Sequence, residues 1–262
     1  MKNLFSMLRR LLAEENIEFL SSLGAESLEI IQPRLMPEGI KSAYFWLIPY
    51  YTGKHPDRNV SLYSVSRDYH LFSHHISAKI KPLLEKEFPG EGFYFFCDSS
   101  PVNEVAAAAK CGLGVIGKNR LLINEKYGSY VFIGSLLTTL NPEVKESEFK
   151  TVGGCINCGA CEKICGFLGG KSDVCFSELN QKKQVTETEL LTIHSRKIRW
   201  GCDDCQEICP MNRRAQNTPI GFFYEDIIEN VTCGYIDSLS KIELKQRAYG
   251  WRGRAIIKRN IE

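Results

Sequence analysis

Hydrophobic and polar positions follow two different periods along the first 150 residues. Apolar residues recur at helical spacing over residues 2–15, and a long helix is expected over residues 67–87 although it contains Pro82. Nearly unbroken apolar runs predict three buried strands, at residues 42–51, 92–98 and 129–140. Because helices and strands alternate, residues 1–150 are expected to form an α/β (α+β) domain.

The alanine-rich segment "VNEVAAAAKCG" predicts a further helix that opens at "SSP" and ends at Gly112. The strand over residues 129–140 is expected to pair with "RLLIN" (120–124) across the turn "EKYG". Residues 112–117, "GLGVIG", match the G-x-G-x-x-G pattern of dinucleotide sites, which needs a strand before it and a helix after it. Here a helix precedes and a strand follows, so we reject a Rossmann site.

The composition changes after residue 150. Residues 151–218 are rich in cysteine, with short helical pieces, and predict a second, smaller domain. Residues 219–262 predict a helical segment that becomes basic at its end. The N-terminus lacks the pattern of a signal peptide and no apolar run is long enough for a membrane span. We therefore expect a cytoplasmic protein that does not contact a membrane.

Charge alone does not identify a partner. The chain has 33 Lys and Arg against 31 Asp and Glu, a formal charge of +2, which neither demands nor excludes a polyanion.

Eleven cysteines in a chain without an export signal indicate inorganic ligation and not disulfides. One run has the spacing C-x2-C-x2-C-x3-C, and a second, C-x2-C-x3-C, is followed by Pro210. In bacterial ferredoxins three cysteines of a run hold one cube and the fourth crosses to the other. This arrangement predicts a ferredoxin-like domain with two 4Fe–4S clusters, one held by Cys155, Cys158, Cys161 and Cys209, the other by Cys165, Cys175, Cys202 and Cys205.

Two zinc sites are the alternative for the same cysteines. Zinc sites usually combine separated C-x2-C pairs, often with histidine, and His194 is the only imidazole nearby. The compact runs therefore favour iron–sulfur clusters, although Gly166 stands where a proline usually follows the run. The other three cysteines are expected to be buried apolar thiols, at positions Cys97, Cys111 and Cys233.

Asp98 stands at the end of an apolar strand, where open α/β sheets tend to place ligands. Five of the six preceding residues are apolar, so partial desolvation is expected to raise its pKa toward the range of a proton donor. The alternative is that Asp98 caps the helix that begins near Pro101.

Four segments together with both cysteine runs resemble the epoxyqueuosine reductase family: "SRDYH" (66–70), "CDSSPVNEVAAAAKCGLGVIGKN" (97–119), "YGSYVFIGSLLTTL" (127–140) and "RGRAIIKRN" (252–260). The resemblance runs from about residue 40 to the C-terminus. It implies a cytoplasmic enzyme that carries cobalamin and two 4Fe–4S clusters and converts epoxyqueuosine to queuosine in tRNA. An electron donor such as flavodoxin or ferredoxin is implied as well.

The same resemblance implies roles for individual residues. Asp98 becomes the proton donor, and Asp68 lies beside it in the active site. Residues expected at the cobalamin are Asp68, Asp98, Lys118, Asn119, Ser177 and Asp203. The chemistry is coherent, because turning an epoxide into an alkene needs two electrons and protonation of the departing oxygen. The first domain is thus expected to bind cobalamin and substrate.

Residues 245–259 contain six Lys or Arg, no acidic residue, and the aromatic residues Tyr249 and Trp251. This pattern suits phosphate contacts with a stacking platform for a base. The alternative is an amphipathic terminal helix whose charges face water. We expect a short form of the family that lacks its C-terminal helical repeats. Two further functions stay open: reduction of a different, small substrate by the same machinery, or ferredoxin-type electron transfer without catalysis.

Overall fold

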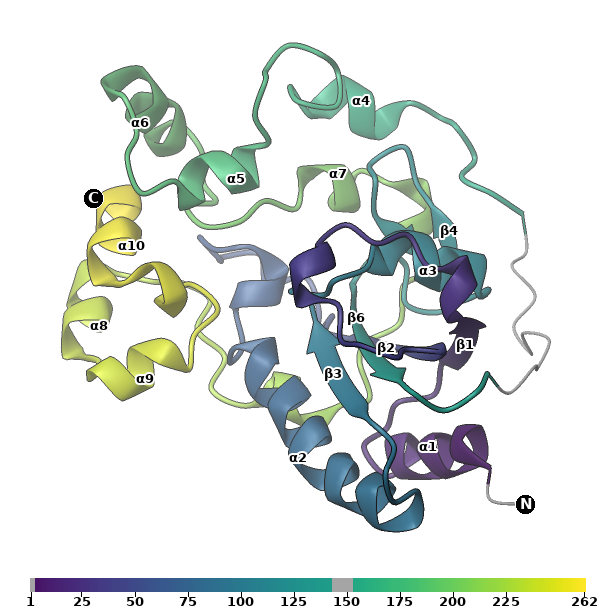
Figure 1. The fold of residues 1–262 in the computed structure, drawn as a ribbon. Helices are drawn as coiled ribbons and strands as arrows, with labels where there is room; N and C mark the ends of the chain where they lie inside the picture. The colour runs from purple at the N-terminus through teal and green to yellow at the C-terminus, as the bar shows by residue number, and fades with distance from the viewer. Residues whose placement is uncertain (1–2, 143–152) are drawn as a thin grey trace.

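The computed structural model describes residues 3–142 and 153–262 (Figure 1). The domain boundary predicted between residues 150 and 151 lies outside the described residues. The elements before it form a sheet with helices on both sides, and those after it are helices joined by loops (Figure 1). The first part has the mixed α/β class that the sequence predicts, and the ferredoxin-like character of the second part stays a prediction.

The central sheet has four strands in the order β1-β2-β6-β3, and every neighbouring pair is antiparallel. The strands are β1 (Leu20–Gly24), β2 (Ser42–Pro49), β3 (Phe93–Cys97) and β6 (Val131–Thr138). The layer is thus α+β, without the parallel crossovers of a doubly wound fold. The predicted pairing of β6 with "RLLIN" is wrong, because β2 and β3 occupy both edges of β6. Instead β5 (Leu122–Ile123) pairs with β4 (Val115–Ile116) in a separate hairpin.

All eight residues of β2 are buried, because helices cover both faces of the sheet. Its even-numbered residues, such as Tyr44 and Trp46, pack with α1 (Leu4–Ala13) and α2 (Tyr69–Glu87). Its odd-numbered residues, such as Phe45, pack with α3 (Glu104–Lys110) on the opposite face. Each large apolar side chain buried in this way contributes about 1.5–3 kcal/mol to stability.

The cysteine-rich segment and the C-terminal segment form two further groups of helices (Figure 1). The first group comprises α4 (Ala160–Ile164), α5 (Phe176–Gln181), α6 (Glu187–His194) and α7 (Asp204–Glu207). The second comprises α8 (Cys233–Ser238), α9 (Lys241–Lys245) and α10 (Arg254–Ile261). A separate apolar cluster around Trp200 and Tyr249 holds the C-terminal helices against the segment that precedes α2. The predicted helical character of residues 219–262 is confirmed.

Several predicted element ends agree with the structure. Pro82 lies inside α2, as expected. Gly112 follows the end of α3 with a φ of 84°, a left-handed conformation that glycine adopts without strain, so its interpretation as a helix cap is confirmed. A strand, β4, comes after this glycine, and the arrangement differs from a dinucleotide-binding turn.

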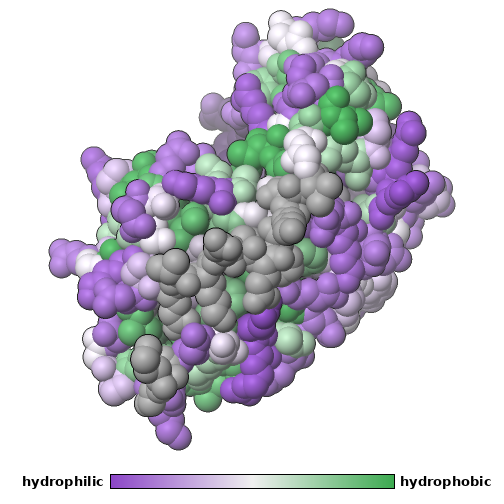
Figure 2. Space-filling model, turned by 90° about the vertical axis from the view of Figure 1, so that its right-hand side faces the viewer, coloured by the Kyte–Doolittle hydropathy of each residue, from purple (hydrophilic) through white to green (hydrophobic). Residues whose placement is uncertain are grey.

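No helix within the described ranges is long and apolar enough to cross a membrane. On the face seen in Figure 2, hydrophilic side chains predominate and hydrophobic ones gather in small separate patches. Cys97 and Cys111 are buried as predicted, whereas the prediction for Cys233 is wrong. Cys233 begins the short surface helix α8 and is only partly buried.

Candidate active site and cysteine clusters

The carboxyl group of Asp98 is exposed at the carboxyl end of β3. Its backbone has a φ of 68°, a left-handed conformation that costs a residue other than glycine on the order of 1–2 kcal/mol. Two contacts hold it there. Its Oδ2 accepts a hydrogen bond from the Tyr69 hydroxyl at 2.7 Å, and its backbone N–H donates to Glu104 Oε2 at 3.0 Å.

Burial, together with the nearby charge of Asp98, raises the pKa of Tyr69 far above its ordinary value. The phenol therefore keeps its proton and remains a donor to the carboxylate. Because Tyr69 is buried at the first turn of α2, its hydroxyl has a fixed position relative to β3. Tyr69 is thus a positioning residue for Asp98.

Two expectations for Asp98 are corrected by the structure. The capping alternative is wrong, because α3 begins later and its N-cap is Asn103, whose side chain accepts from the backbone N–H of Ala106 at 3.1 Å. The expected desolvation is wrong as well. Asp98 is exposed because the left-handed turn lifts it away from the apolar strand.

Asp68 lies in the same site as Asp98, as the sequence predicts. It is the N-cap of α2, and its Oδ1 accepts from the backbone N–H of His70 at 3.0 Å and from the His70 ring at 2.9 Å. The hydrogen bond with Asp68 raises the pKa of His70, and the charge of Asp98 adds to this effect. Asp68 therefore binds the imidazole directly, whereas Asp98 acts on it through its charge alone.

Glu104 is a third carboxyl group in this site, and sequence reasoning missed it. Its Oε1 accepts from the Ser135 hydroxyl at 2.8 Å, and its Oε2 accepts from Asp98 N–H. Burial raises the pKa of Glu104 to about 7, although these two donors oppose the shift. Glu104 stands within the quoted segment around Asp98, but nothing in its spacing indicates the contact.

We expect the substitution Glu104→Gln to change how stability depends on pH. An unfolded glutamate titrates near 4.5, so the folded chain binds an extra proton between about pH 4.5 and 7. The wild-type free energy of unfolding therefore decreases across this window, by on the order of 3 kcal/mol from Glu104 alone. Glutamine does not titrate, so the stability of the variant relative to wild type should rise from pH 4.5 to 8.

Chemical denaturation of the reconstituted protein at a series of pH values measures this difference. Asp203 also has a raised pKa, about 6, but it is present in both proteins and cancels. A difference between the two proteins that stays constant with pH would contradict the assignment.

The predicted ligands of the first cluster lie together. Cys155, Cys158, Cys161 and Cys209 line one small hollow, which also includes Lys118 and Asn119. The loop that carries the first three winds around it through left-handed residues at Asn157 and Gly159. Because α4 packs against α7, Cys209 is brought to the same place although it is far away in sequence.

The predicted ligands of the second cluster also lie near one another. Burial raises the pKa of the Cys205 thiol to about 12, and charges on Cys202, Cys165 and Cys175 add to this effect, which acts only over short distances. A smaller contribution comes from Cys161 of the first group. The two groups of cysteines are therefore adjacent.

No three His, Cys, Asp or Glu side chains in residues 3–142 and 153–262 converge closely enough to hold a single metal ion. A 4Fe–4S cluster needs a different arrangement from a single ion, because each cysteine binds a different iron atom and the four thiolates surround a hollow. The first four cysteines line such a hollow, so their number, type and arrangement fit a 4Fe–4S cluster.

The six residues expected at the cobalamin form separate groups. Asp68 and Asp98 lie at β3, while Lys118 and Asn119 lie with the first cysteine group. Ser177 lies on α5, two residues after Cys175, and its Oγ accepts from Gln181. The cysteine loops thus share their surroundings with the residues that the resemblance assigns to the corrin.

Asp203 connects the cysteine-rich segment to the first domain. It is 1% exposed, and its Oδ2 accepts from Leu62 N–H at 2.9 Å and from Arg58 at 3.2 Å. Burial raises its pKa to about 6, although Arg58 opposes this. Its Oδ1 has no partner among the described residues, and such a buried acceptor costs about 1–3 kcal/mol. A ligand with N–H donors, such as the amide side chains of cobalamin, fits this atom.

Tyr63 is influenced by the same buried carboxyl group. Burial raises the pKa of Tyr63 to about 12, and the charge of Asp203 adds to the effect. Tyr63 in turn adds a small contribution to the raised pKa of Tyr69.

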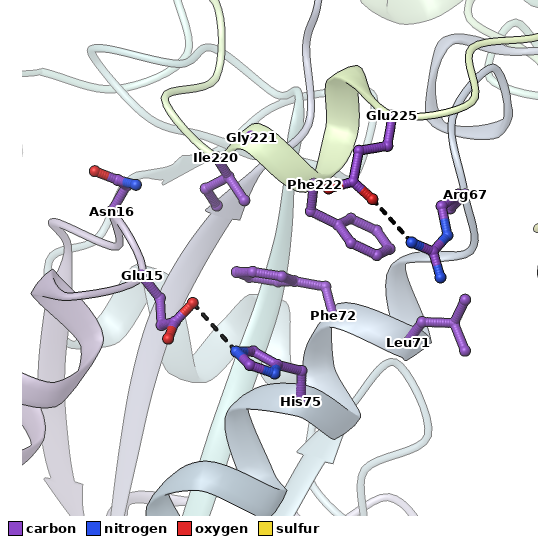
Figure 3. Close-up of a pocket in the computed structure, with 10 residues that line it drawn as sticks. All are labelled: Glu15, Asn16, Arg67, Leu71, Phe72, His75, Ile220, Gly221, Phe222 and Glu225. Carbon is purple, nitrogen blue, oxygen red and sulfur yellow. Dashed lines mark hydrogen bonds and ion pairs between the residues drawn. The ribbon is translucent and has the colours of Figure 1, made fainter.

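A separate hollow of about 420 Å³ lies beside α2 and contains none of the predicted site residues (Figure 3). Figure 3 shows the rings of Phe72 and Phe222 between two ion pairs. Arg67 pairs with Glu225 at 2.8 Å, and His75 pairs with Glu15 at 3.3 Å. The ion pairs hold these side chains along the wall of the hollow, and Arg67 Nε is buried there without a hydrogen-bond partner among the described residues.

The basic segment 245–259 differs from both sequence interpretations. Tyr249 is fully buried beside Trp200, so its proposed stacking role is wrong. Arg247 is buried and donates to the carbonyl of Asp226. Trp251 is 58% exposed, with the Arg252 guanidinium over its ring. Part of the segment is therefore structural, and its exposed part centres on Trp251.

The sheet, the carboxyl site and the cysteine groups together define a mixed α/β protein in which a group of carboxyl side chains and two adjacent groups of cysteines lie on one fold. No family model matches the chain. The epoxyqueuosine reductase of Pseudomonas aeruginosa is 38% identical over 174 residues, 63% of this chain and 46% of the relative. That of Escherichia coli is 35% identical over 166 residues, 61% of this chain and 43% of the relative. That of Leadbetterella byssophila is 32% identical over 209 residues, 74% of this chain and 66% of the relative.

The chain spans about half the length of the curated relatives it matches first. It belongs to the epoxyqueuosine reductase family, as the sequence motifs indicate. A solved epoxyqueuosine reductase from Streptococcus thermophilus covers 99% of this chain and 80% of its own, with a TM-score of 0.78 at 23% identity. A crystal structure of an epoxyqueuosine reductase with an epoxyqueuosine-modified tRNA-Tyr stem loop has the same TM-score and coverage at 18% identity. At these identities the two structures show the shared fold.

Proposed function

We propose that this chain is an oxidoreductase that converts epoxyqueuosine to queuosine in tRNA, with cobalamin and two 4Fe–4S clusters as cofactors. The observation that carries the proposal is the placement of Asp98. At the end of β3, Tyr69 holds its carboxyl and Glu104 holds its backbone N–H, in a chain whose relatives are named for this reaction. The adjacent cysteine groups support the cofactors of the proposal.

Removing the epoxide oxygen as water and forming a C=C bond consumes two electrons and two protons. When bound, the cobalamin and the clusters supply the two electrons, which originate from a donor such as flavodoxin or ferredoxin. Asp98 gives one proton to the departing oxygen, and solvent supplies the second. Tyr69 keeps the carboxyl in position, and the left-handed backbone presents it to the substrate.

The residues that hold the cofactors follow from the site. Each group of four cysteines holds one cluster, in a segment that we propose to be ferredoxin-like. With cobalamin bound, Asp203 would be a residue that holds it, because its Oδ1 is an acceptor without a partner among the described residues. Asp68 holds the His70 ring beside Tyr69.

The tRNA part of the proposal predicts a salt-dependent contact through basic residues of segment 245–259, such as the exposed Lys245 and the partly buried Arg252. Charge reversal by Lys245→Glu together with Arg252→Glu should weaken binding of an epoxyqueuosine-modified stem loop. If each side chain contacts one phosphate, the slope of log Kd against log salt concentration should decrease by about 2. Lys86→Glu, on the exposed side of α2, is the matched control and should leave binding unchanged.

Conversion of the stem loop and of the free modified nucleoside should be measured with the same proteins. The proposal expects the charge reversal to slow conversion of the stem loop and not that of the nucleoside. Equal conversion of both substrates by wild type and variant would instead assign the chain to a small substrate.

A further inference from the structure

The side-chain amide of Asn119 is buried without a partner for its N–H group. Asn119 is 7% exposed and lies at the tip of the hairpin formed by β4 and β5. Its Oδ1 accepts from Leu121 N–H at 3.3 Å, and its Nδ2 has no hydrogen-bond partner among the described residues. An unsatisfied buried amide costs about 1–3 kcal/mol, and native structures contain few such groups.

The backbone of the hairpin determines which end of the amide is available. Gly117 N–H donates to Leu121 O at 2.9 Å, and Arg120 N–H donates to Gly117 O at 2.8 Å, which closes a tight turn around Asn119. A Cβ on Gly117 would lie 2.3 Å from Asn119 Oδ1, so glycine leaves the room that this side chain needs. Since Oδ1 is already an acceptor, Nδ2 is the end left to donate.

The residue that carries this N–H group lines the hollow of the first cysteine group. Asn119 shares it with Cys155, Cys158, Cys161 and Cys209. The neighbouring Lys118 also lines the hollow, but its Nζ already pairs with Glu162 at 3.1 Å. The amide of Asn119 is thus a neutral donor beside four thiols, and sulfur of a cluster is the acceptor that the hollow provides.

We propose that Asn119 Nδ2 donates a hydrogen bond to a sulfur atom of the first 4Fe–4S cluster and raises the reduction potential of that cluster. Reduction adds negative charge to the cluster, so an N–H donor at sulfur stabilises the reduced form more than the oxidised form. The inference rests on the proposed cluster and differs from the corrin contact that the sequence resemblance implies for Asn119. The hairpin of the first domain would thus tune the reduction potential of a cluster that the cysteine-rich segment holds.

Two substitutions test the inference without substrate and without cobalamin. Asn119→Asp keeps the acceptor for Leu121 and removes the N–H donor, while Asn119→Leu removes both. Anaerobic redox titration of the reconstituted proteins by electron paramagnetic resonance should show one midpoint potential shifted to more negative values. The shift should be larger for aspartate, and the other potential should stay as in wild type. Asn16→Asp adds the same charge at a distant exposed position and should change neither potential.

Unchanged potentials with wild-type iron content would overturn the inference. Loss of half the iron in both variants would also overturn it, because Asn119 would then be a structural residue of the loop. A decrease in cobalamin affinity without any change in potential would assign the amide to the corrin and also overturn it. If wild type itself assembled no cluster, the proposed function would fail before Asn119 was tested.

Discussion

Replacing Asp98 with asparagine is expected to reduce the rate of epoxide oxygen removal by about 10²- to 10⁴-fold, the usual contribution of a general acid. Asparagine has nearly the same shape, and its oxygen still accepts from the Tyr69 hydroxyl, so the turn after β3 should persist. What the variant lacks is a proton for the departing oxygen. Single-turnover conversion, followed by mass spectrometry of the digested nucleosides, measures the rate.

The Asp98 result depends on intact cofactor sites and a matched control. Iron and cobalamin contents of Asp98→Asn should equal those of wild type. Glu85→Gln changes a carboxylate to an amide on the exposed side of α2 and should leave the rate unchanged. A rate for Asp98→Asn within a factor of about two of wild type would remove Asp98 from its role as the acid.

The second large effect concerns the cysteine groups. Cys209→Ala and Cys205→Ala should each abolish one cluster, so that iron and sulfide contents of the reconstituted protein fall by about half. Each variant removes a thiol from a different group, and the double variant should assemble neither cluster. Electron transfer to the active site should then stop in all three proteins.

Cys233→Ala is the control for these substitutions, because Cys233 lies on α8 outside both groups. Its iron content should equal that of wild type. Zinc bound in place of iron, or iron content unchanged in both single variants, would contradict the two-cluster arrangement and return the cysteines to the zinc alternative.

Sequence periodicity identified the main elements of the first domain but not the direction of its strands. The unbroken apolar run of β2 arises because helices cover both faces of the sheet. The same run is typical of parallel sheets, which are also covered on both faces. The antiparallel pairing of β6 with β2 and β3 distinguishes this sheet from a parallel one, and such long-range pairing leaves no local signal in the sequence.

The candidate site was likewise predictable only in part from the sequence. Cysteine spacing predicted that the thiols form two groups of four, because the two runs together with Cys175 supply the four corners of two cubes. Contacts between elements were not predictable. Tyr69 and Glu104 reach Asp98 from the starts of two different helices, and the burial of Tyr249 depends on packing against Trp200.

The measurement that tests the central claim most directly is the mass of the modified nucleoside after reaction. The protein is reconstituted anaerobically with iron, sulfide and cobalamin and is given reductant and tRNA that carries epoxyqueuosine. We predict that the nucleoside loses the mass of one oxygen atom. An unchanged mass, with both clusters assembled and cobalamin bound, would contradict the assignment of epoxyqueuosine in tRNA as the substrate.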